Sequence, residues 1–581
     1  MNNQEIAKLL RSVATALTLK KASIFQIRAY ETASDAIEHS TSEVRDLWQE
    51  KRLDEIPGVG VSLQAHLEEL FKTGSVKHFE QLKKDFPKVV FELIDIPGVG
   101  PKTALELAKL GVKSFEDLKL KINSGELVKK GFSAKIAEKI SLGLKETQNR
   151  TGRMLLPFAD AKAQKIVDYL KKIPGVVAAD SLGSLRRQVV TIGDLDFAAA
   201  SKNPKQTIDQ FVKMPEVKRI IDQGENRGTV ILDSGLQIDL LVGQPDTYGA
   251  LLQHFTGSKH HNIKLRSFAE KKNLSLSEYG VKNTKTNKVV PILKESELYE
   301  MLGMQTPPPE IREDNGEIEA ALAHKLPSLV ELKDIKGDFH LHSNFPMVHP
   351  SHGPGANSIE EIIKRAINLR YDYVGISDHP PGFRTTSEKE LLSILHKRTK
   401  EIEQLKSSYQ KSIRVLNGLE IDILSDGTLS VPNEVLANLD YSIAGVHSVH
   451  RMEKDKMTKR ILKALENPEV DILAHPTGRL LNERDSYDVD WEVIFEFAAK
   501  KNKIMEINAF PNRLDLRDDL VRLALKFKAK FIVNTDAHEI SQMENMKYGI
   551  SVARRGWLES KDVVNSWDWK RVLKWFKIKK S

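Results

Sequence analysis

The chain has 581 residues, of which 40% are hydrophobic and 29% charged, and it contains no cysteine. This length predicts about four domains, and the composition excludes collagen-like, mucin-like and wholly disordered chains. Without cysteine there can be no disulfide, thiolate nucleophile or cysteine zinc site, so any metal must be bound by histidines and carboxylates.

The net charge of +8 lies in the first half of the chain. Residues 1–300 hold 46 Lys and Arg against 38 Asp and Glu, whereas residues 301–581 hold 42 of each. The excess favours a polyanion-binding first half, although excesses of this size also occur on ordinary solvated surfaces. No apolar run approaches 18 residues, and the first residues predict an amphipathic helix without the apolar core and cleavage site typical of a signal peptide. We therefore expect a soluble, cytoplasmic monomer without membrane contact.

Apolar residues at spacings of three and four predict helices throughout the first 150 residues. The sequence Ile-Pro-Gly-Val-Gly occurs at 56–60 and again at 96–100, each time before a predicted helix. Glycines there permit a tight turn, and the first amides of the next helix can face a phosphate. One copy could be only a turn between packed helices, but two copies favour a binding role. The pattern resembles the helix-hairpin-helix motif of DNA repair and replication proteins, which implies DNA binding at Gly58, Gly60, Gly98 and Gly100.

From about residue 155, short β-rich runs alternate with helices and predict an α+β domain. Asp194 and Asp196 are two residues apart in one such run, so both carboxylates should lie on one face of a strand. Asp239 stands inside an apolar run, where an unpaired carboxylate would be costly. Any one of these acids alone could be a solvated residue at a strand end. Together they predict a site for two Mg²⁺ ions.

Four segments in this region resemble the nucleotidyltransferase core of the family X DNA polymerases, the group that contains DNA polymerase beta. They are GSLRR at 183–187, GDLDF at 193–197, IDLL at 238–241 and HFTGSKHHNIKLR at 254–266. The resemblance covers residues 1 to about 312 and implies template-directed DNA synthesis, with Asp194, Asp196 and Asp239 as catalytic metal ligands. It implies substrate contacts from Arg153, Ser184, Arg187 and Gly193 to the triphosphate, Phe255, Thr256 and Gly257 to the sugar, Asn262 to the base and Arg266 to the template strand. His254 and Gln237 depart from the vertebrate pattern, which has Tyr and Arg there.

Some members of that family also have 5′-deoxyribose-phosphate lyase activity, which uses a lysine amine to form a Schiff base. In the helix after the first repeat, His66 stands at the expected nucleophile position and Ser62 at that of a supporting lysine. An imidazole cannot form the imine, so we expect no lyase activity. Lys72 is the alternative nucleophile, but on a continuous helix it would point elsewhere.

After the proline-containing segment 303–336, apolar strands alternate with helical stretches, which predicts a distorted barrel of βα units. Ten of the 17 histidines follow residue 336, and several stand at predicted strand ends. The set resembles the PHP (polymerase and histidinol phosphatase) domain, which implies three ions, Mn²⁺, Zn²⁺ or Fe²⁺, and hydrolysis of a DNA 3′ end. The implied ligands are His340, His342, His379, Glu420, His447, His475, Asp536 and His538, with Glu420 bridging two ions.

The ninth ligand of that family is an Asp that this chain lacks. His352 is our candidate substitute and His349 the alternative. Arg451 and Arg479 follow two of the ligand histidines, and they could bind substrate phosphate or be ordinary surface arginines.

The sequence thus predicts a multidomain protein. The expected parts are a helical DNA-binding domain at 1–90, a second helical subdomain at 91–152, a palm at 153–245, a thumb at 246–312, a linker at 313–336 and a PHP domain at 337–575. We expect a repair polymerase that adds dNTPs to primer 3′ ends in gapped or primer–template DNA, with a 3′-5′ exonuclease. The alternative is a PHP phosphatase or nuclease whose inactive transferase core only binds DNA. A non-enzymatic scaffold would not need the acid and histidine clusters.

Overall fold

The computed structural model shows two compact units, residues 1–152 and 153–581, which are described separately. The described residues are 3–38, 44–49, 53–56, 58–94, 96, 99–124, 126–129, 132, 136, 140, 153–347, 349, 353–382 and 385–576. Within these ranges, no helix is long and apolar enough to cross a bilayer.

The first unit is helical and has two separate hydrophobic clusters, one among helices α1 to α5 and one among α6 to α9. The helices are α1 (Asn3–Leu19), α2 (Ile24–Glu38), α3 (Val44–Gln49), α4 (Val61–Thr73), α5 (Lys77–Lys83), α6 (Lys88–Leu93), α7 (Pro101–Lys109), α8 (Phe115–Asn123) and α9 (Glu126–Lys129). In α4, Leu63, Leu67 and Leu70 are buried, which is the spacing that places side chains on one face of a helix.

The glycines of the repeat have different roles. Gly58 has a φ of +82°, and a Cβ there would lie 2.7 Å from the Ala33 nitrogen, so the turn requires glycine. Gly60 and Gly100 directly precede α4 and α7, and a Cβ at either would meet no atom within 4 Å. The backbone at these two helix starts is therefore accessible. Gly98 lies outside the described residues.

The second unit begins with a five-stranded sheet in the order β2-β4-β7-β6-β5. Its strands are β2 (Val176–Ser181), β4 (Leu195–Ser201), β5 (Val217–Gln223), β6 (Arg227–Leu232) and β7 (Gln237–Gly243). Alternate residues of β4 enter two different hydrophobic clusters, one shared with helices α11 (Leu156–Leu170) and α13 (Pro204–Phe211), the other with α14 (Tyr248–Thr256). The helices thus cover both faces of the central strand. A small antiparallel pair, β1 (Met154–Leu155) with β3 (Thr191–Ile192), and the short helix α12 (Gly183–Arg186) complete this part.

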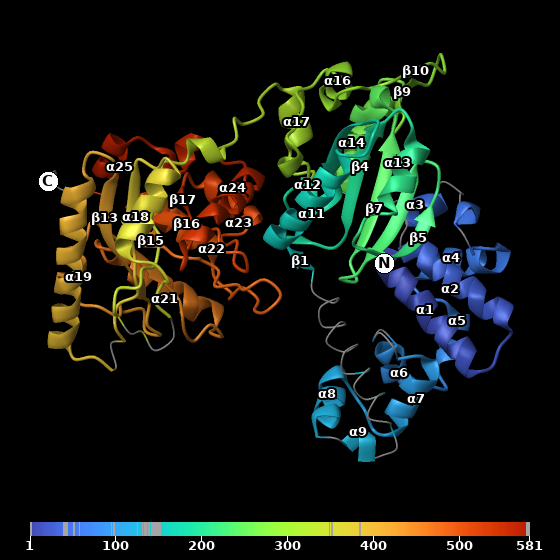
Figure 1. Ribbon diagram of the computed structural model, residues 1–581, viewed down its shortest axis with the longest axis horizontal. Helices are drawn as coiled ribbons and strands as arrows, with labels where there is room; N and C mark the ends of the chain where they lie inside the picture. Colours follow the sequence, from blue (N-terminus) through green and yellow to red (C-terminus); the bar gives the residue numbers. More distant parts are fainter. Residues whose placement is uncertain are drawn as a thin grey trace. The chain divides into compact units, whose positions relative to one another are not determined.

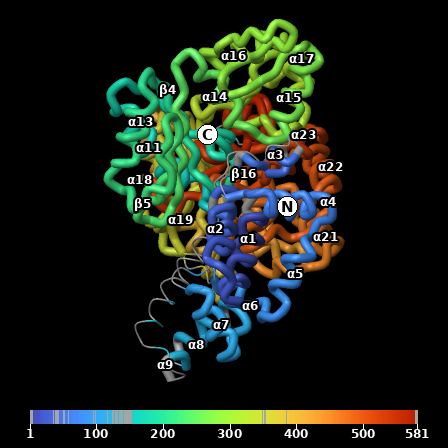
Figure 2. The backbone as a smooth tube through the Cα atoms, turned by 90° about the vertical axis from the view of Figure 1, so that its right-hand side faces the viewer, coloured from blue at the N-terminus to red at the C-terminus, as the bar shows by residue number. Residues whose placement is uncertain are grey.

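Helices α14, α16 and α17 lie together in both views of the molecule (Figures 1 and 2). This group comprises α15 (Lys259–Lys271), α16 (Glu295–Met301), α17 (Glu317–Leu322) and a three-stranded sheet of β8 (Leu274–Ser277), β9 (Gly280–Asn283) and β10 (Val289–Val290). Leu265, Leu298 and Ile318 share one buried cluster, so α17, which lies in the segment predicted as a linker, packs against α15 and α16.

The C-terminal part is a seven-stranded parallel sheet in sequence order, with helices around it (Figure 1). The strands are β11 (Gly337–Asp338), β12 (Tyr373–Ile376), β13 (Arg414–Asp422), β14 (Tyr441–Gly445), β15 (Ile472–Leu473), β16 (Ile504–Asn508) and β17 (Lys530–Asn534). The helices are α18 (Ile359–Asn368), α19 (Glu388–Tyr409), α20 (Asn433–Leu436), α21 (Lys454–Glu466), α22 (Trp491–Lys501), α23 (Asp518–Lys526), α24 (Met546–Arg555) and α25 (Trp569–Trp575). A parallel bridge between Leu341 and Ala537 joins the two edges, so the sheet is a nearly closed barrel.

Aromatic side chains fill the interior of this barrel. Phe339, Tyr373 and Tyr441 share a buried cluster with Phe576, which follows α25. The Tyr441 hydroxyl donates to the Phe339 carbonyl at 2.5 Å, and its ring occupies the space that a Cβ on Gly418 would need. Because the interior is packed, polar side chains gather at the strand ends.

The fold class predicted from the sequence is confirmed: a helical N-terminal region, an α+β middle and a C-terminal βα barrel. The predicted domain boundaries and monomeric state stay predictions.

Candidate active sites

The first candidate site lies on neighbouring strands of the five-stranded sheet. Asp196 in β4 and Asp239 in β7 are direct partners in the parallel register, and Asp194 immediately precedes β4. Burial, together with the Asp239 and Asp194 carboxylates, raises the pKa of Asp196 to about 7. Neighbouring carboxylates oppose each other's ionisation, and a divalent cation between them stabilises their charged form.

Three polar side chains hold Asp239 in place. Thr229 Oγ1 donates to its Oδ1 at 2.5 Å, and Gln237 Nε2 donates to its Oδ2 at 2.8 Å. Arg227 Nη2 lies 3.5 Å from Oδ1. Gln237, one of the departures from the family pattern, thus still contacts the third aspartate. Sequence analysis missed Arg227, because it reaches Asp239 from the next strand, β6, and has no local signature.

The predicted triphosphate residues lie around helix α12. Arg153 Nη1 is 3.2 Å from where a Cβ on Gly193 would stand, and Arg153 Nε donates to Thr191 Oγ1 at 2.8 Å. Ser184 is in α12 itself. A Cβ on Gly183, the first residue of α12, would lie 3.2 Å from Asp196 Oδ2, which places this short helix beside the aspartates. The structure therefore brings the predicted triphosphate residues and the acids to one region.

Arg187 connects this region to the predicted sugar-binding segment. Its Nη1 donates to the Thr256 carbonyl at 2.5 Å, and its Nε donates to Glu313 at 3.0 Å. Gly257 follows with a φ of +69°, and a Cβ there would lie 3.0 Å from Arg187 Nη1. The guanidinium and the 256–257 turn are therefore in close contact.

The remaining predicted substrate residues lie on α14 and α15. Asn262 donates to the His254 carbonyl at 2.7 Å and accepts from Gln253 at 2.9 Å. The Phe255 ring packs edge-on against His254 at 4.7 Å between centroids. Burial, partly offset by Glu278, lowers the pKa of His254, and Arg266 lowers it further. Phe255, Asn262 and Arg266 are thus gathered around His254, the second departure from the family pattern.

The second candidate site lies at the C-terminal ends of the barrel strands. Three sets of histidines and carboxylates have donor atoms within 4.8 Å of one another in the part of the chain that the structure describes. The sets are His340, His342, Glu420 and Asp536; Glu420, His447 and His475; and His342, His379 and His538. All eight ligands expected from the sequence are therefore brought together.

Glu420 stands between these sets. Its Oε2 lies 3.0 Å from Nε2 of both His340 and His379, and its Oε1 lies 2.9 Å from Nε2 of both His447 and His475. The two oxygens thus face different histidine groups, as a carboxylate that bridges two ions would. A Cβ on Gly445 would lie 2.9 Å from a ring carbon of each of His447 and His475, so only glycine lets these rings meet.

Burial and charge in this cluster favour a bound cation. Nε2 of His340 is buried without a hydrogen bond, although it lies 3.0 Å from Glu420 and 3.4 Å from Asp536. Burial favours neutral His340, but the Glu420, Glu506 and Asp536 carboxylates raise its pKa well above the ordinary value. Burial lowers the pKa of His342 to about 4. A cation between the rings and carboxylates would satisfy both kinds of group.

Sequence analysis missed Glu506, in β16. Its Oε1 lies 2.7 Å from His340 Nδ1 and accepts from Asn534 at 2.9 Å, while its Oε2 accepts from the His475 amide at 2.7 Å and from Asn508 at 3.1 Å. Glu506 is fully buried. With a carboxylate at Nδ1, that nitrogen is the protonated one and Nε2 is left as the ligand atom. The signal in the sequence that could have identified Glu506 is an acidic residue inside the apolar segment IMEIN.

The ninth ligand of the barrel site was predicted as His352 or, alternatively, His349. His352 lies outside the described residues and stays a prediction. His349, the alternative, has its Nε2 3.2 Å from Asp422 Oδ2 and its ring 5.3 Å from that of His379. Asp422 Oδ1 also lies 2.6 Å from His447 Nδ1, so one carboxylate orients two histidines.

Of the two arginines considered for phosphate binding, Arg479 is buried, and its guanidinium donates to the Arg513 and Leu514 carbonyls. Its burial contradicts the interpretation as an ordinary surface arginine, and phosphate binding by Arg479 stays a prediction. Arg451 is exposed. Arg513, missed from the sequence, has its Nε 3.4 Å from Asp536 Oδ2.

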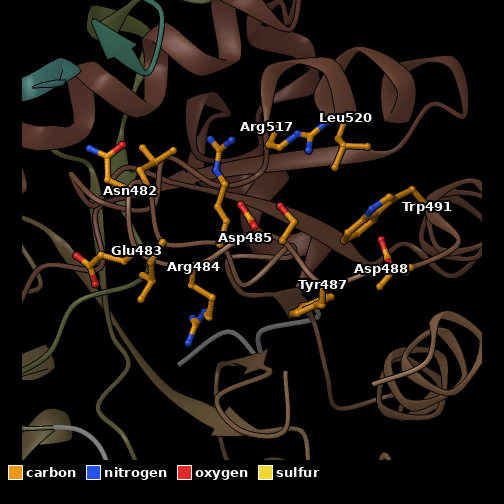
Figure 3. Close-up of a pocket in the computed structure, with 14 residues that line it drawn as sticks. Asn482, Glu483, Arg484, Asp485, Tyr487, Asp488, Trp491, Arg517 and Leu520 are labelled. Atoms are coloured by element: carbon orange, nitrogen blue, oxygen red, sulfur yellow. The ribbon is translucent and has the colours of Figure 1, made fainter. Parts of the chain in front are cut away.

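Arg479 also borders a surface pocket that is lined by residues 479–489, Trp491, Arg517 and Leu520 (Figure 3). The lining combines cationic Arg484 and Arg517 with anionic Asp485 and Asp488. None of these belongs to a ligand set. We assign no chemistry to this mixed surface.

In the helical unit, His66 is held among other rings. Its Nδ1 lies 3.1 Å from the Tyr30 hydroxyl, and its ring stacks on that of His78 at 5.2 Å. Burial, with the nearby His78, lowers the pKa of His66. Lys72 pairs with Glu68 at 2.9 Å on the exposed side of α4.

Four segments match known families. Residues 1–76 match the helix-hairpin-helix domain, 90–146 the SAM-like helix-hairpin-helix tandem, 251–313 the DNA polymerase beta thumb and 338–510 the PHP domain. The DNA polymerase/3'-5' exonuclease PolX of Bacillus subtilis is 34% identical over 577 residues, which cover 97% of this chain and 98% of that protein. The chain belongs to the PolX family.

Other relatives match one half of this PolX-family chain. DNA polymerase lambda of Arabidopsis thaliana is 28% identical over 44% of this chain and 49% of its own length. A probable phosphatase of Clostridium acetobutylicum is 30% identical over 32% of this chain and 74% of its own length. The resemblance to family X polymerases with a PHP domain, predicted from the sequence, is confirmed.

Proposed function

We propose that this protein is a DNA repair polymerase that adds dNTPs to primer 3′ ends in gapped DNA and removes 3′-terminal nucleotides in its PHP domain. The observation that supports this most is that one chain, similar over almost its whole length to a polymerase/exonuclease, contains both the aspartate cluster and the three barrel sets. Its substrates are then gapped or primer–template DNA and dNTPs.

In the polymerase site, Asp194, Asp196 and Asp239 would bind two Mg²⁺ ions. When bound, these ions activate the primer 3′-hydroxyl and neutralise charge on the triphosphate. The raised pKa of Asp196 supports this fit, because the acids are crowded without a compensating cation. Thr229, Gln237 and Arg227 orient Asp239. Arg153, Ser184, Arg187 and Gly193 would bind the triphosphate, Phe255, Thr256 and Gly257 the sugar, Asn262 the base and Arg266 the template strand.

In the PHP site, the eight predicted ligands, completed by His352 or His349, would hold three ions of Mn²⁺, Zn²⁺ or Fe²⁺. Such ions lower the pKa of bound water and bind the oxygens of a scissile phosphodiester. The buried, unpaired Nε2 of His340 supports this fit. Glu420 would bridge two ions, and Glu506 orients His340. Arg513 Nε lies 3.4 Å from the Asp536 carboxylate.

The helical unit would hold DNA by its backbone. Gly60 and Gly100 begin helices with open space above the backbone, where amides can meet phosphate oxygens. Gly58 sets the turn that presents the first of these helices. Gly98, the matching residue of the second repeat, stays a predicted DNA-binding residue.

A gapped duplex with a labelled primer tests the polymerase proposal directly. With Mg²⁺ or Mn²⁺ and dNTPs, we expect template-directed extension, and without dNTPs we expect shortening from the 3′ end. Extension should be lost in Asp194→Ala with Asp196→Ala. A protein that degrades the primer but never extends it, under any metal tested, would contradict the polymerase role.

The similarity to probable phosphatases favours a second candidate, a PHP phosphatase with an inactive transferase core. The two candidate functions differ in their products. A phosphatase releases inorganic phosphate from a 3′- or 5′-phosphorylated end or from p-nitrophenyl phosphate, whereas an exonuclease releases nucleotides. Product analysis on a 3′-hydroxyl oligonucleotide separates them.

A further inference from the structure

Helix α24 of the barrel contacts the polymerase core along one face. Ser551 Oγ donates to Gln188 at 3.0 Å, and Tyr548 donates to Asp160 at 3.0 Å. Lys547, one turn before Ser551, pairs with the same Asp160 at 2.9 Å. Residues three and four apart share a face of a helix, so one stripe of α24 carries these contacts.

Arg555 ends this stripe, and its side chain is only 8% exposed. Its Nε donates to Asp518 in α23 at 2.7 Å, which anchors the guanidinium within the barrel domain. Its Nη1 donates to the Arg187 carbonyl at 2.9 Å and to the Glu313 carboxylate at 3.0 Å. Nη1 also donates to the Glu310 carbonyl at 3.3 Å, so a barrel residue contacts three groups of the polymerase core.

Two of these contacts bear on the position of Arg187. Arg555 bonds the carbonyl of Arg187 directly, and Glu313 Oε1, which Arg555 shares, accepts from Arg187 Nε at 3.0 Å. The other end of the Arg187 guanidinium is bonded to the Thr256 carbonyl. The backbone and the side chain of Arg187 are therefore both positioned from the barrel side.

We propose that Arg555 is a positioning residue for nucleotide binding: it sets Arg187 through the Arg187 carbonyl and Glu313, so that tight dNTP binding depends on α24 of the barrel domain. This inference rests on the proposed polymerase function, in which Arg187 binds the triphosphate. Arg555 belongs to none of the three barrel ligand sets, so we expect exonuclease activity to be retained without it.

The planar guanidinium is needed because its contacts diverge. It reaches Asp518 with Nε and the polymerase core with Nη1, whereas lysine offers all its donors from one nitrogen. Arg555→Lys keeps the charge and one contact with Glu313, and it should recover part of what Arg555→Ala loses.

The test is steady-state dNTP incorporation by the full-length chain on a gapped duplex, with Arg555→Ala, Arg555→Lys and Lys547→Ala compared with the wild type. Lys547→Ala is the matched control, because Lys547 lies on the same face of α24 and its ammonium pairs with Asp160 of α11. We expect Arg555→Ala to raise the KM for dNTP about tenfold, as for loss of charged hydrogen bonds, with kcat changed by less than about twofold.

Exonuclease activity on single-stranded DNA and the melting temperature are recorded for every variant. The proposal is supported by an intermediate KM for Arg555→Lys, a wild-type KM for Lys547→Ala and exonuclease rates near wild type in every variant. If Arg555→Ala does not fold, Arg555→Lys still tests the proposal. An unchanged or lower KM in both Arg555 variants, or an equal rise in Lys547→Ala, overturns it. Wild-type protein that extends no primer contradicts the proposed function as well, whereas wild-type extension with an unchanged KM contradicts this inference alone.

Discussion

Replacing Glu506 by Gln tests whether a buried carboxylate that binds no ion itself controls metal binding in the barrel. The two oxygens of Glu506 face four nitrogen atoms: His340 Nδ1 and Asn534 Nδ2 on Oε1, and the His475 amide and Asn508 Nδ2 on Oε2. Glutamine has the same shape but turns one of these acceptors into an NH₂ group. Either orientation of the amide leaves two donors facing another donor.

The expected cost follows from that count. A buried donor without an acceptor costs about 1–3 kcal/mol, so two of them amount to about 2–6 kcal/mol of folding free energy. His340 can avoid part of this cost by moving its proton from Nδ1 to Nε2, because Nδ1 then accepts from the amide. The protonated Nε2 can no longer bind an ion. We therefore expect metal affinity about 10–100-fold below wild type.

The assay is metal content after equilibrium dialysis against buffered Mn²⁺ or Zn²⁺, with the unfolding midpoint measured with and without a chelator. Exonuclease activity at limiting metal should fall in parallel and recover partly in excess metal, while primer extension is unchanged. Glu496→Gln, an exposed substitution on α22, is the control and should behave as wild type. Wild-type metal content and stability in Glu506→Gln would refute the role of Glu506.

Three further predictions concern the whole protein. Asp194→Ala with Asp196→Ala should abolish extension and spare the exonuclease, and His340→Ala with His342→Ala should do the reverse; loss of both activities in either folded variant counts against independent sites. DNA affinity should fall steeply with salt and differ little between unrelated sequences, because the proposed contacts are to phosphates; a strong preference for one duplex sequence would contradict this. Borohydride should trap no crosslink between the protein and a pre-incised abasic substrate. The imidazole of His66 forms no imine, and Lys72 is paired with Glu68 on the exposed side of its helix. A crosslink in the helical unit would instead show lyase chemistry.

Local patterns in the sequence predicted the three acids of the first site and the histidines at the ends of the barrel strands. The period of two that joins Asp194 to Asp196, and the apolar run around Asp239, depend only on neighbouring residues. The histidines at strand ends were found in the same way, and the barrel brings eight predicted ligands together because parallel strands end on one side.

Residues that act across the fold were not found. Arg227 reaches Asp239 from an adjacent strand, and Arg555 reaches Arg187 from a position 368 residues later in the chain. Neither stands in a pattern that differs from an ordinary surface arginine. The burial of Arg479 was not predicted for the same reason, since its contacts with the Arg513 and Leu514 carbonyls depend on a distant loop.

The contrast between Glu420 and Glu506 shows what the structure adds to such patterns. Both are acids inside apolar barrel strands, and both are fully buried, so the desolvation argument applies to each equally. The difference lies in what their oxygens face. Glu506 is surrounded by N–H donors that satisfy it without an ion, whereas the oxygens of Glu420 face Nε2 atoms of four histidines. With a cation bound, Glu506 would hold the proton of His340 at Nδ1, so that Nε2, beside Glu420, is the atom left to bind the cation.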